Sequence, residues 1–356
     1  MSFPRARLDR DALRNNLNVV RRLAPQSRIM AVIKADAYGH GVVPVSKALH
    51  DADAFGLARL QEAIAMRNAG VTKPLVLLEG VFSVEQLQIA AQEDLEIVVH
   101  CLEQVQMLQS LASSHRFTVW LKLDSGMHRL GFSPEEFEAA YQILKKLSAV
   151  RELRLMTHLA SADQVESPQT SEQIVRFQSA IQNKPEQRSI ANSAGVIAWP
   201  NAHGDWVRPG LMLYGMSPIE ERSAESLGLR PVMTLTTEVI AVQNVRVGEP
   251  VGYNARWRAT RDSRIAIAAI GYGDGYPRNM PSGTPVLVND RRASIAGRVS
   301  MDMIAIDVTE MGPVKLGDPV TLWGKGLPTE LIAKHAQTNA YELVCRINER
   351  VSAVWD

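Results

Sequence analysis

Cysteine is scarce and charge is balanced in this chain of 356 residues. Cys101 and Cys345 are the only cysteines. They are too few for a disulfide framework and have no metal-ligand spacing, so we expect two ordinary reduced thiols. With 39 basic and 38 acidic residues, no large uniform field draws the protein to nucleic acid or to an anionic membrane. These properties favour a small-molecule ligand and argue against a nucleic-acid partner.

Long apolar runs are absent as well. Residues 1–14 mix charged side chains into a helix-like pattern and lack the apolar core of a secretion signal, and no later segment stays apolar for a membrane-spanning length. We therefore expect no membrane partner and a cytoplasmic location. The 8 histidines are scattered without a paired spacing, which predicts no metal site.

Apolar residues make up 46% of the sequence, which is enough to fill the cores of about two domains. Up to about residue 214, short β-branched runs alternate with segments of helical spacing. Ser83 and Ser133 each precede such a segment and are typical helix caps. The predicted strands cover residues 28–35, 53–58, 74–79, 96–100, 117–124, 153–159, 188–193 and 205–208. Repeated strand-then-helix units predict an α/β fold, a parallel (β/α)8 barrel, rather than an open doubly wound sheet.

Beyond about residue 230 the sequence is rich in strand patterns separated by glycine, proline and Asn/Asp turns. The predicted strands cover residues 234–245, 264–270, 285–288, 294–308 and 319–322, and a late helix covers residues 328–336. The polar stretch 217–230 suits a boundary between two cores. We therefore predict a barrel domain over residues 1–230 and a mostly β domain over residues 231–356.

Functional groups of such barrels lie where strands end and the following loops begin. Lys34 ends the first apolar strand. A partly desolvated amine there can lose its charge and form an imine with an aldehyde, although this position alone fits a solvent-facing lysine better. Lys122 and Asp124 share one face of the fifth strand because side chains alternate. A structural ion pair and a substrate-binding pair explain these two charges equally well.

A phosphate site is predicted where the last two strands end. Barrels often bind a phosphate between the loops after strands seven and eight, through backbone N–H groups at a helix start. Ser193 ends the seventh predicted strand, and Gly210 and Leu211 follow Arg208 at the end of the eighth. Gly210 allows the backbone to approach a ligand closely.

Several segments resemble signatures of the alanine racemase family. AVIKADAYGHG at residues 31–41 resembles the family's cofactor-lysine signature. Further matching segments follow in the family's order over nearly the whole chain: KLDSGMHRLG at 122–131, WVRPG at 206–210, VGY at 251–253, GYGDGYPR at 271–278 and VSMDM at 299–303. So long a set of matches is not expected by chance.

This resemblance implies a pyridoxal 5'-phosphate enzyme that interconverts L-alanine and D-alanine, supplying D-alanine for peptidoglycan. Lys34 would hold the cofactor as an aldimine and act as one base. Tyr253 would be the second base, because racemisation removes a proton from one face of the α-carbon and returns one on the other. Arg208 would donate to the pyridine nitrogen. A guanidinium stays protonated and does not favour a protonated ring, which limits transamination.

The same resemblance assigns residues around the cofactor. The phosphate would be held by Tyr38, Ser193, Gly210, Leu211 and Tyr341. His158, at the end of the sixth predicted strand, would link Arg208 to Tyr253. Nearby positive charge would help the tyrosine to lose its proton.

Other family positions concern the substrate. Arg129 and the Met301 N–H would receive the substrate carboxylate. Lys122 matches a family lysine that is often carbamylated, and a carbamate is an anion able to hold Arg129 in place. Tyr272 and Tyr341 would narrow the entrance and favour a side chain no larger than a methyl group.

Lys34 and Tyr253 lie in different predicted domains, and the resemblance implies that they meet across a head-to-tail homodimer with two shared sites. Two departures from the family pattern stand out. Leu159 replaces a phenylalanine of many relatives, and residues 350–355 differ from the usual basic, tyrosine-bearing tail. Neither touches the proposed chemistry.

Other functions stay open at this point. A racemase of another or broader amino-acid range fits the same pattern, because pocket size depends on a few loop side chains. A related decarboxylase fits less well, since an acidic group and a cysteine are expected where Arg208 and Tyr253 stand. A non-catalytic pyridoxal-phosphate-binding barrel protein would lack the β domain. The glycine-rich stretch 271–275 has no clear helix after it, so we predict no phosphate loop there.

Overall fold

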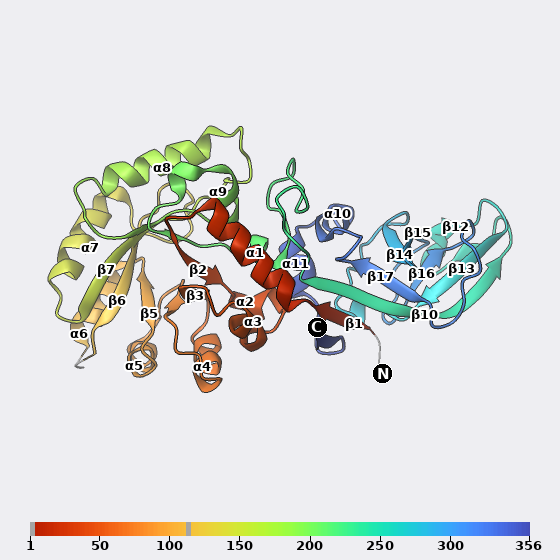
Figure 1. Cartoon of the computed structure of the whole chain (residues 1–356), viewed down its shortest axis with the longest axis horizontal. Helices are drawn as coiled ribbons and strands as arrows, with labels where there is room; N and C mark the ends of the chain where they lie inside the picture. Colours follow the sequence, from red (N-terminus) through yellow and green to blue (C-terminus); the bar gives the residue numbers. More distant parts are fainter. Residues whose placement is uncertain (1–3, 112–114) are drawn as a thin grey trace.

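The computed structural model describes residues 4–111 and 115–356 and consists of two lobes joined end to end (Figure 1). A barrel lobe comes first along the chain, and a lobe built mostly of strands follows. The prediction of a (β/α)8 barrel followed by a mostly β domain is confirmed. None of the described helices is long and apolar enough to span a bilayer.

The barrel closes from 8 parallel strands, each hydrogen-bonded to the next in chain order. They are β2 (Arg28–Val32), β3 (Ala54–Leu57), β4 (Leu75–Leu77), β5 (Glu96–Val99), β6 (Phe117–Lys122), β7 (Val150–Met156), β8 (Arg188–Ser189) and β9 (Trp206–Val207). Pairing of β9 with β2 completes the ring. Each strand overlaps one of the predicted strand segments, because apolar runs buried on both faces mark parallel strands clearly.

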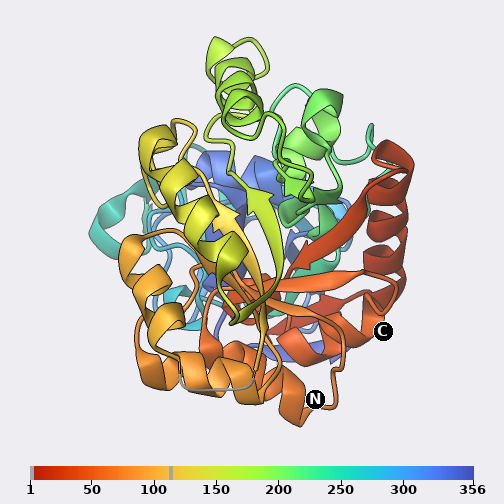
Figure 2. The same ribbon diagram turned by 90° about the vertical axis from the view of Figure 1, so that its left-hand side faces the viewer.

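The barrel lobe has nine described helices, most of which surround the strands on the outside (Figure 2). They are α1 (Arg10–Leu23), α2 (Lys34–Gly39), α3 (Val42–Ala48), α4 (Leu60–Asn68), α5 (Val84–Gln92), α6 (Leu102–Ser110), α7 (Pro134–Lys146), α8 (Pro168–Ala180) and α9 (Ser193–Ala198), with 3-10 turns η1 (Pro200–Ala202) and η2 (Leu211–Tyr214). The predicted cap at Ser133 is present, since its hydroxyl accepts the Glu136 N–H at 3.3 Å. Ser83 caps α5 in the same way through the Gln86 N–H.

A charged and aromatic network fills the barrel interior away from the carboxyl ends of the strands. The guanidinium carbon of Arg154 lies 5.0 Å from the ring centres of both Trp120 and Trp206. The same guanidinium binds the Glu96 carboxylate at 3.1 Å, and the Trp120 indole donates to it at 2.7 Å. Because these buried groups pair with one another, the barrel interior is filled by side chains at this end.

In the second lobe, β10 pairs with both β13 and β17, which closes a ring of antiparallel strands. Around this ring lie β10 (Met233–Val245), β13 (Ser263–Ala268), β16 (Ile304–Asp307), β15 (Arg291–Ile295), β14 (Pro285–Val288) and β17 (Pro319–Trp323). Both ends of the chain join this sheet: β1 (Arg5–Leu8) pairs with β10, and β18 (Ser352–Trp355) pairs with β1. A small ribbon of β11 (Pro250–Val251) and β12 (Trp257–Arg258) encloses the turn η3 (Tyr253–Ala255).

Two sequence interpretations are wrong in detail. The predicted strand 294–308 is broken into β15 and β16, because Gly297 has φ +90° and a turn closes where the Ser300 N–H donates to the Met303 carbonyl at 3.0 Å. Residues 1–14 are not one helical segment, since β1 precedes α1.

Two further helices, α10 (Thr329–His335) and α11 (Ala340–Cys345), lie where the lobes meet (Figure 1). α11 packs against α2 of the barrel lobe.

Candidate active site

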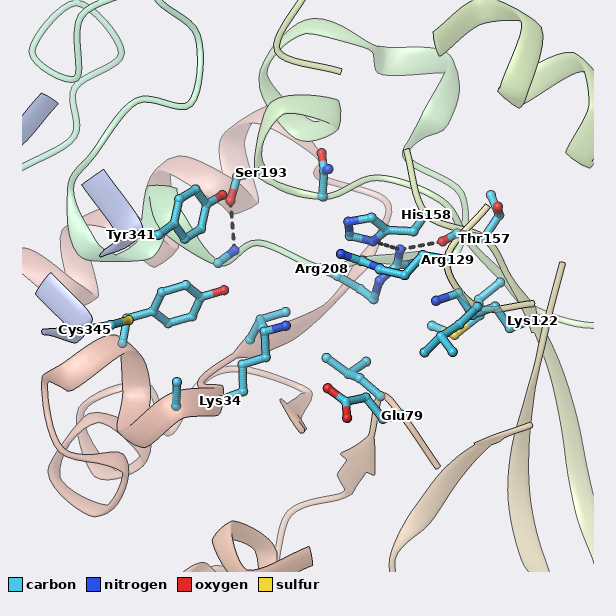
Figure 3. A pocket seen from close by; sticks show the side chains of 18 residues that line it. Lys34, Glu79, Lys122, Arg129, Thr157, His158, Ser193, Arg208, Tyr341 and Cys345 are labelled. Atoms are coloured by element: carbon cyan, nitrogen blue, oxygen red, sulfur yellow. Dashed lines mark hydrogen bonds between the residues drawn. The ribbon is translucent and has the colours of Figure 1, made fainter. Parts of the chain in front are cut away.

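A cavity of about 500 Å³ opens at the carboxyl ends of the barrel strands (Figure 3). It brings together nine of the predicted site residues: Lys34, Tyr38, Lys122, Arg129, His158, Ser193, Arg208, Gly210 and Tyr341. Most stand at or just after the end of a barrel strand, whereas Tyr341 reaches the cavity from α11. The pocket is therefore rich in cations and is bordered by a helix from the C-terminal part of the chain.

Lys34 begins an unusual left-handed turn. Ala35, Asp36, Ala37 and Tyr38 have φ values from +51° to +55°, a conformation that disfavours non-glycine residues by about 1–2 kcal/mol each. This turn redirects the chain immediately after β2, so the Lys34 amine points into the cavity (Figure 3). Among the described residues, the amine makes no hydrogen bond or ion pair.

Side chains hold this turn in its strained conformation. The Asp36 carboxylate accepts the Val42 N–H at 2.7 Å. His40 is buried, and its Nδ1 lies 2.9 Å from the Tyr38 carbonyl and 3.1 Å from the Ala37 carbonyl. Nδ1 must carry the hydrogen because both neighbours are acceptors. Burial lowers the pKa of His40 to about 4, so the ring holds the turn as a neutral donor at physiological pH.

Arg208 is the most deeply bound cation of the pocket. Its Nη1 donates to the Ser189 hydroxyl at 2.5 Å, and its Nη2 donates to the Thr157 carbonyl at 2.6 Å. Nη2 also lies 3.4 Å from Nδ1 of His158. Nε donates to no acceptor among the described residues. Burial lowers the pKa of Arg208 to about 10, which leaves the guanidinium charged at neutral pH.

Lys122 is buried among cations. Burial, with Arg208 and Arg129 nearby, lowers the pKa of Lys122 to about 8. The ion pair with Asp124 that the sequence left open does not form: the Asp124 carboxylate instead accepts backbone N–H groups, the nearest at 2.9 Å from Gly126. Burial and the positive charge of Arg208 also hold the pKa of His158 well below its usual range.

Backbone N–H groups converge at the other end of the pocket. The Ser193 hydroxyl accepts the Gly210 N–H at 2.8 Å and the Met212 N–H at 3.3 Å. A Cβ at Gly210 would lie 2.7 Å from the Tyr38 hydroxyl, so only glycine leaves this space free. The Tyr341 ring centre lies 5.5 Å from that of Tyr38, and burial raises the Tyr341 pKa to about 12. We call this group of hydroxyl and backbone N–H groups the phosphate cradle, because groups of this kind commonly bind phosphates.

Four predicted residues do not line this cavity. Leu211 lies behind it in η2 and is buried. Tyr253, Tyr272 and Met301 belong to the second lobe and are 65%, 37% and 52% exposed. Within one chain, therefore, the cavity contains only part of the predicted site.

The structure also places residues at the cavity that sequence reasoning missed. Glu79 follows β4, Thr157 follows β7, and Asn192 precedes α9. Cys345, predicted to be an ordinary thiol, also lines the cavity from α11. The strand-end rule could have found the first three, because each lies at or near the end of a predicted barrel strand. The family resemblance had brought Tyr341 of α11 to the site, but no signal in the sequence singled out Cys345.

A lysine at a barrel strand end, a buried arginine and a phosphate cradle, followed by a β lobe, define a two-domain barrel enzyme. The sequence profile of the alanine racemase N-terminal domain matches residues 8–218, and that of the C-terminal domain matches residues 232–355. The chain is 49% identical to the biosynthetic alanine racemase of Escherichia coli strain K12 over 97% of both chains, and 48% identical to the alanine racemase of Shewanella sediminis over 99% of both.

Solved structures agree with these sequence comparisons. The biosynthetic alanine racemase of Pseudomonas aeruginosa superposes with a TM-score of 0.98 at 44% identity. The alanine racemase of Acinetobacter baumannii superposes with a TM-score of 0.95 at 40% identity, and each comparison covers 100% of both chains. The chain belongs to the alanine racemase family and is an amino-acid racemase.

Proposed function

We propose that the protein interconverts L-alanine and D-alanine with pyridoxal 5'-phosphate, using Lys34 and Tyr253 of the partner subunit as two bases. The observation that carries this proposal is the arrangement of the cavity. An amine without a partner in the described chain, a buried arginine and a phosphate cradle all face one space.

The side chains of the cavity fit this cofactor. The Lys34 amine is available to anchor its aldehyde carbon. Ser193, Gly210 and the neighbouring N–H groups would hold its phosphate, together with Tyr38 and Tyr341. Leu211 would contribute its backbone N–H from η2. When bound, pyridoxal phosphate supplies the electron sink that makes the α-proton of an amino acid removable.

Arg208 would face the ring nitrogen through Nε, which has no acceptor within the described chain. A pKa of about 10 keeps the guanidinium protonated at neutral pH. It would donate one hydrogen bond and, unlike an acidic partner, would not favour a protonated ring nitrogen. We expect this choice to suppress transamination.

Lys34 and the partner's Tyr253 would move the protons. In one direction the Lys34 amine accepts the α-proton and the phenol donates a proton to the opposite face. In the other direction the two groups exchange these tasks. His158, 3.4 Å from Arg208, would extend the arginine's positive field toward the phenol and thereby stabilise the phenolate.

Arg129 and the Met301 N–H would receive the substrate carboxylate. Arg129 lines the cavity and makes no hydrogen bond among the described residues. A carbamate on Lys122 would give it an anionic partner. This modification is chemically accessible because a lysine with a pKa of about 8 has a large neutral fraction near that pH, and carbon dioxide adds to the neutral amine with loss of a proton.

The shared site requires a homodimer. Tyr253, Tyr272 and Met301 lie on one lobe and stay exposed, whereas Lys34 lies in the cavity of the other lobe. A head-to-tail dimer places each exposed set against the partner's cavity and produces two equal sites. Residues 1–230 would bind the cofactor and residues 231–356 would supply the second base, although β1 joins the sheet of the second lobe.

Tyr272 and Tyr341 would narrow the entrance and select a methyl-sized side chain. The product D-alanine would serve peptidoglycan synthesis from the cytoplasm. The test is incubation of the purified protein with L-alanine and pyridoxal phosphate, followed by chiral analysis. We expect equal amounts of the two enantiomers at equilibrium and much slower conversion of serine, lysine and arginine. Failure to form D-alanine contradicts the proposal, and faster conversion of a larger amino acid contradicts the assigned substrate.

A further inference from the structure

Two loops of the second lobe are packed directly on each other. The first contains η4 (Tyr272–Asp274), and the second contains Met301. The Tyr272 N–H donates to the Ser300 carbonyl at 3.0 Å, and the Gly273 N–H donates to the Met301 carbonyl at 2.8 Å. A Cβ at Gly271 would lie 2.3 Å from both carbonyl oxygens, so the two backbones are in contact. Movement of one loop must therefore displace the other.

Arg350 binds both loops at once. Its Nε lies 3.1 Å from the Asp274 carboxylate, and its Nη2 donates to the Asp302 carboxylate at 2.6 Å. Asp274 is buried and also accepts the Gly271 N–H at 2.8 Å. Asp302 directly follows Met301 in the chain. A guanidinium has a fork of donors that can hold two carboxylates together, which a single ammonium group cannot match. We call Arg350, Asp274 and Asp302 the Arg350 clamp.

The segment around Arg350 is itself fixed against the first loop. The Asn348 amide donates to the Gly273 carbonyl at 2.9 Å, and its oxygen accepts the Arg350 N–H at 3.0 Å. A Cβ at Gly275, which has φ +98°, would lie 2.2 Å from the Arg346 carbonyl oxygen. The guanidinium is thus presented to the two loops from a fixed backbone.

The groups that this clamp positions are still free to bind. The Met301 N–H donates to no acceptor in the part of the chain that the structure describes, and Tyr272 is 37% exposed. We propose that Arg350 is a positioning residue for racemisation, because it fixes the Met301 N–H for the substrate carboxylate and the Tyr272 ring for the entrance. This inference rests on the proposed function, which gives Met301 and Tyr272 those tasks.

The clamp predicts a distinct kinetic signature. The substrate carboxylate is not the reacting group, so its contacts contribute equally to the ground state and to the transition state. Loss of such a contact raises KM and leaves kcat nearly unchanged. Loss of one hydrogen bond to a charged group corresponds to a rise in KM of about tenfold.

The experiment measures steady-state kinetics of the holoenzyme with L-alanine. In Arg350→Lys we expect KM to rise about tenfold while kcat stays within about threefold of wild type. Arg346→Lys is the matched control, since it alters an exposed ion pair with Glu342 in the same segment and leaves the contacts of Arg350 with both loops intact. We expect neither constant to change in this control.

Asp302→Asn tests the clamp without removing charge from a buried carboxylate, because the Asp302 side chain is 54% exposed. We expect a smaller rise in KM in the same direction. In the double variant with Arg350→Lys, KM should rise no further than in Arg350→Lys alone, because both changes break one contact.

An unchanged KM in Arg350→Lys, or a lower kcat with an unchanged KM, overturns the positioning role. If Arg350→Lys does not fold, an unchanged KM in Asp302→Asn overturns it instead. These tests require that the wild-type protein racemises alanine. If the wild-type protein is inactive, that result contradicts the proposed function and not the positioning role of Arg350.

Discussion

Replacement of Lys122 by methionine should stabilise the protein near neutral pH when bicarbonate and cofactor are absent. Lys122 is buried, and burial together with Arg208 and Arg129 lowers its pKa from 10.5 to about 8. Protonation of the amine is therefore about 3 kcal/mol less favourable in the folded protein than in the unfolded chain. Methionine keeps most of the apolar stem and removes the charge.

The sign of the pH dependence follows from linkage. Because the folded pKa of this lysine lies below the unfolded value, the charge destabilises the folded state fully below about pH 8, and this effect disappears as the pH rises toward 10.5. Urea unfolding at pH 6.5 and pH 10 should show Lys122→Met more stable than wild type by up to about 3 kcal/mol at the lower pH and by only about 1 kcal/mol or less at the higher pH.

Lys146→Met is the control, since Lys146 is exposed at the end of α7 and should give almost no difference at either pH. Bicarbonate should stabilise wild type but not Lys122→Met, because a carbamate converts the buried cation into an anion beside Arg129 and Arg208. Lys122→Met should still lose activity, since no carbamate can then form beside Arg129. A variant that is less stable than wild type at pH 6.5, or a stability difference that does not depend on pH, would contradict a destabilising charge at Lys122.

Two further predictions concern the cradle and the barrel interior. Gly210→Ala should weaken pyridoxal phosphate binding at least about tenfold without unfolding the protein, because its Cβ would lie 2.7 Å from the Tyr38 hydroxyl and displace that side chain. Absorbance titration with the cofactor measures this affinity. Gly312→Ala is the control, since a Cβ at Gly312 would have its nearest neighbour 3.8 Å away. Equal cofactor affinities of Gly210→Ala and wild type would contradict the assignment of the cradle. Arg154→Met should destabilise the barrel by about 3–5 kcal/mol, because Glu96 is then left buried without its cation. Its kcat at low temperature should stay near that of wild type, and a large loss of kcat in the folded variant would contradict the purely structural role.

The sequence predicts the barrel well because its strands are apolar runs interrupted by helical patterns. Even β8 and β9, which have only two residues each in the structure, fall within predicted segments. The β lobe is less predictable, since pairing of β1 with β10 joins residues far apart in the chain. The 294–308 segment looks continuous in sequence because small and apolar residues run through the loop that carries Met301.

Prediction of the site succeeds where residues follow strand ends and fails where contacts are long-range. The position of Lys34 at a strand end does not by itself indicate a catalytic role. The family resemblance indicated that role. Nothing in the residues 35–38 indicates a left-handed turn, because non-glycine residues avoid that conformation unless surrounding contacts impose it. The approach of α11 to the barrel, and with it Cys345, likewise depends on how the two lobes pack.

Complementation between two inactive variants tests the shared active site most directly. Lys34→Ala and Tyr253→Phe are each expected to lose nearly all racemisation of alanine as pure dimers. When equal amounts are dissociated and reassociated, about half of the dimers are mixed, and each mixed dimer has one site with both bases intact. One active site in each mixed dimer corresponds to about a quarter of all sites, so we expect recovery of about a quarter of wild-type activity. A mixture in which mixed dimers form but remain inactive would contradict the proposal that Lys34 and the partner's Tyr253 act together.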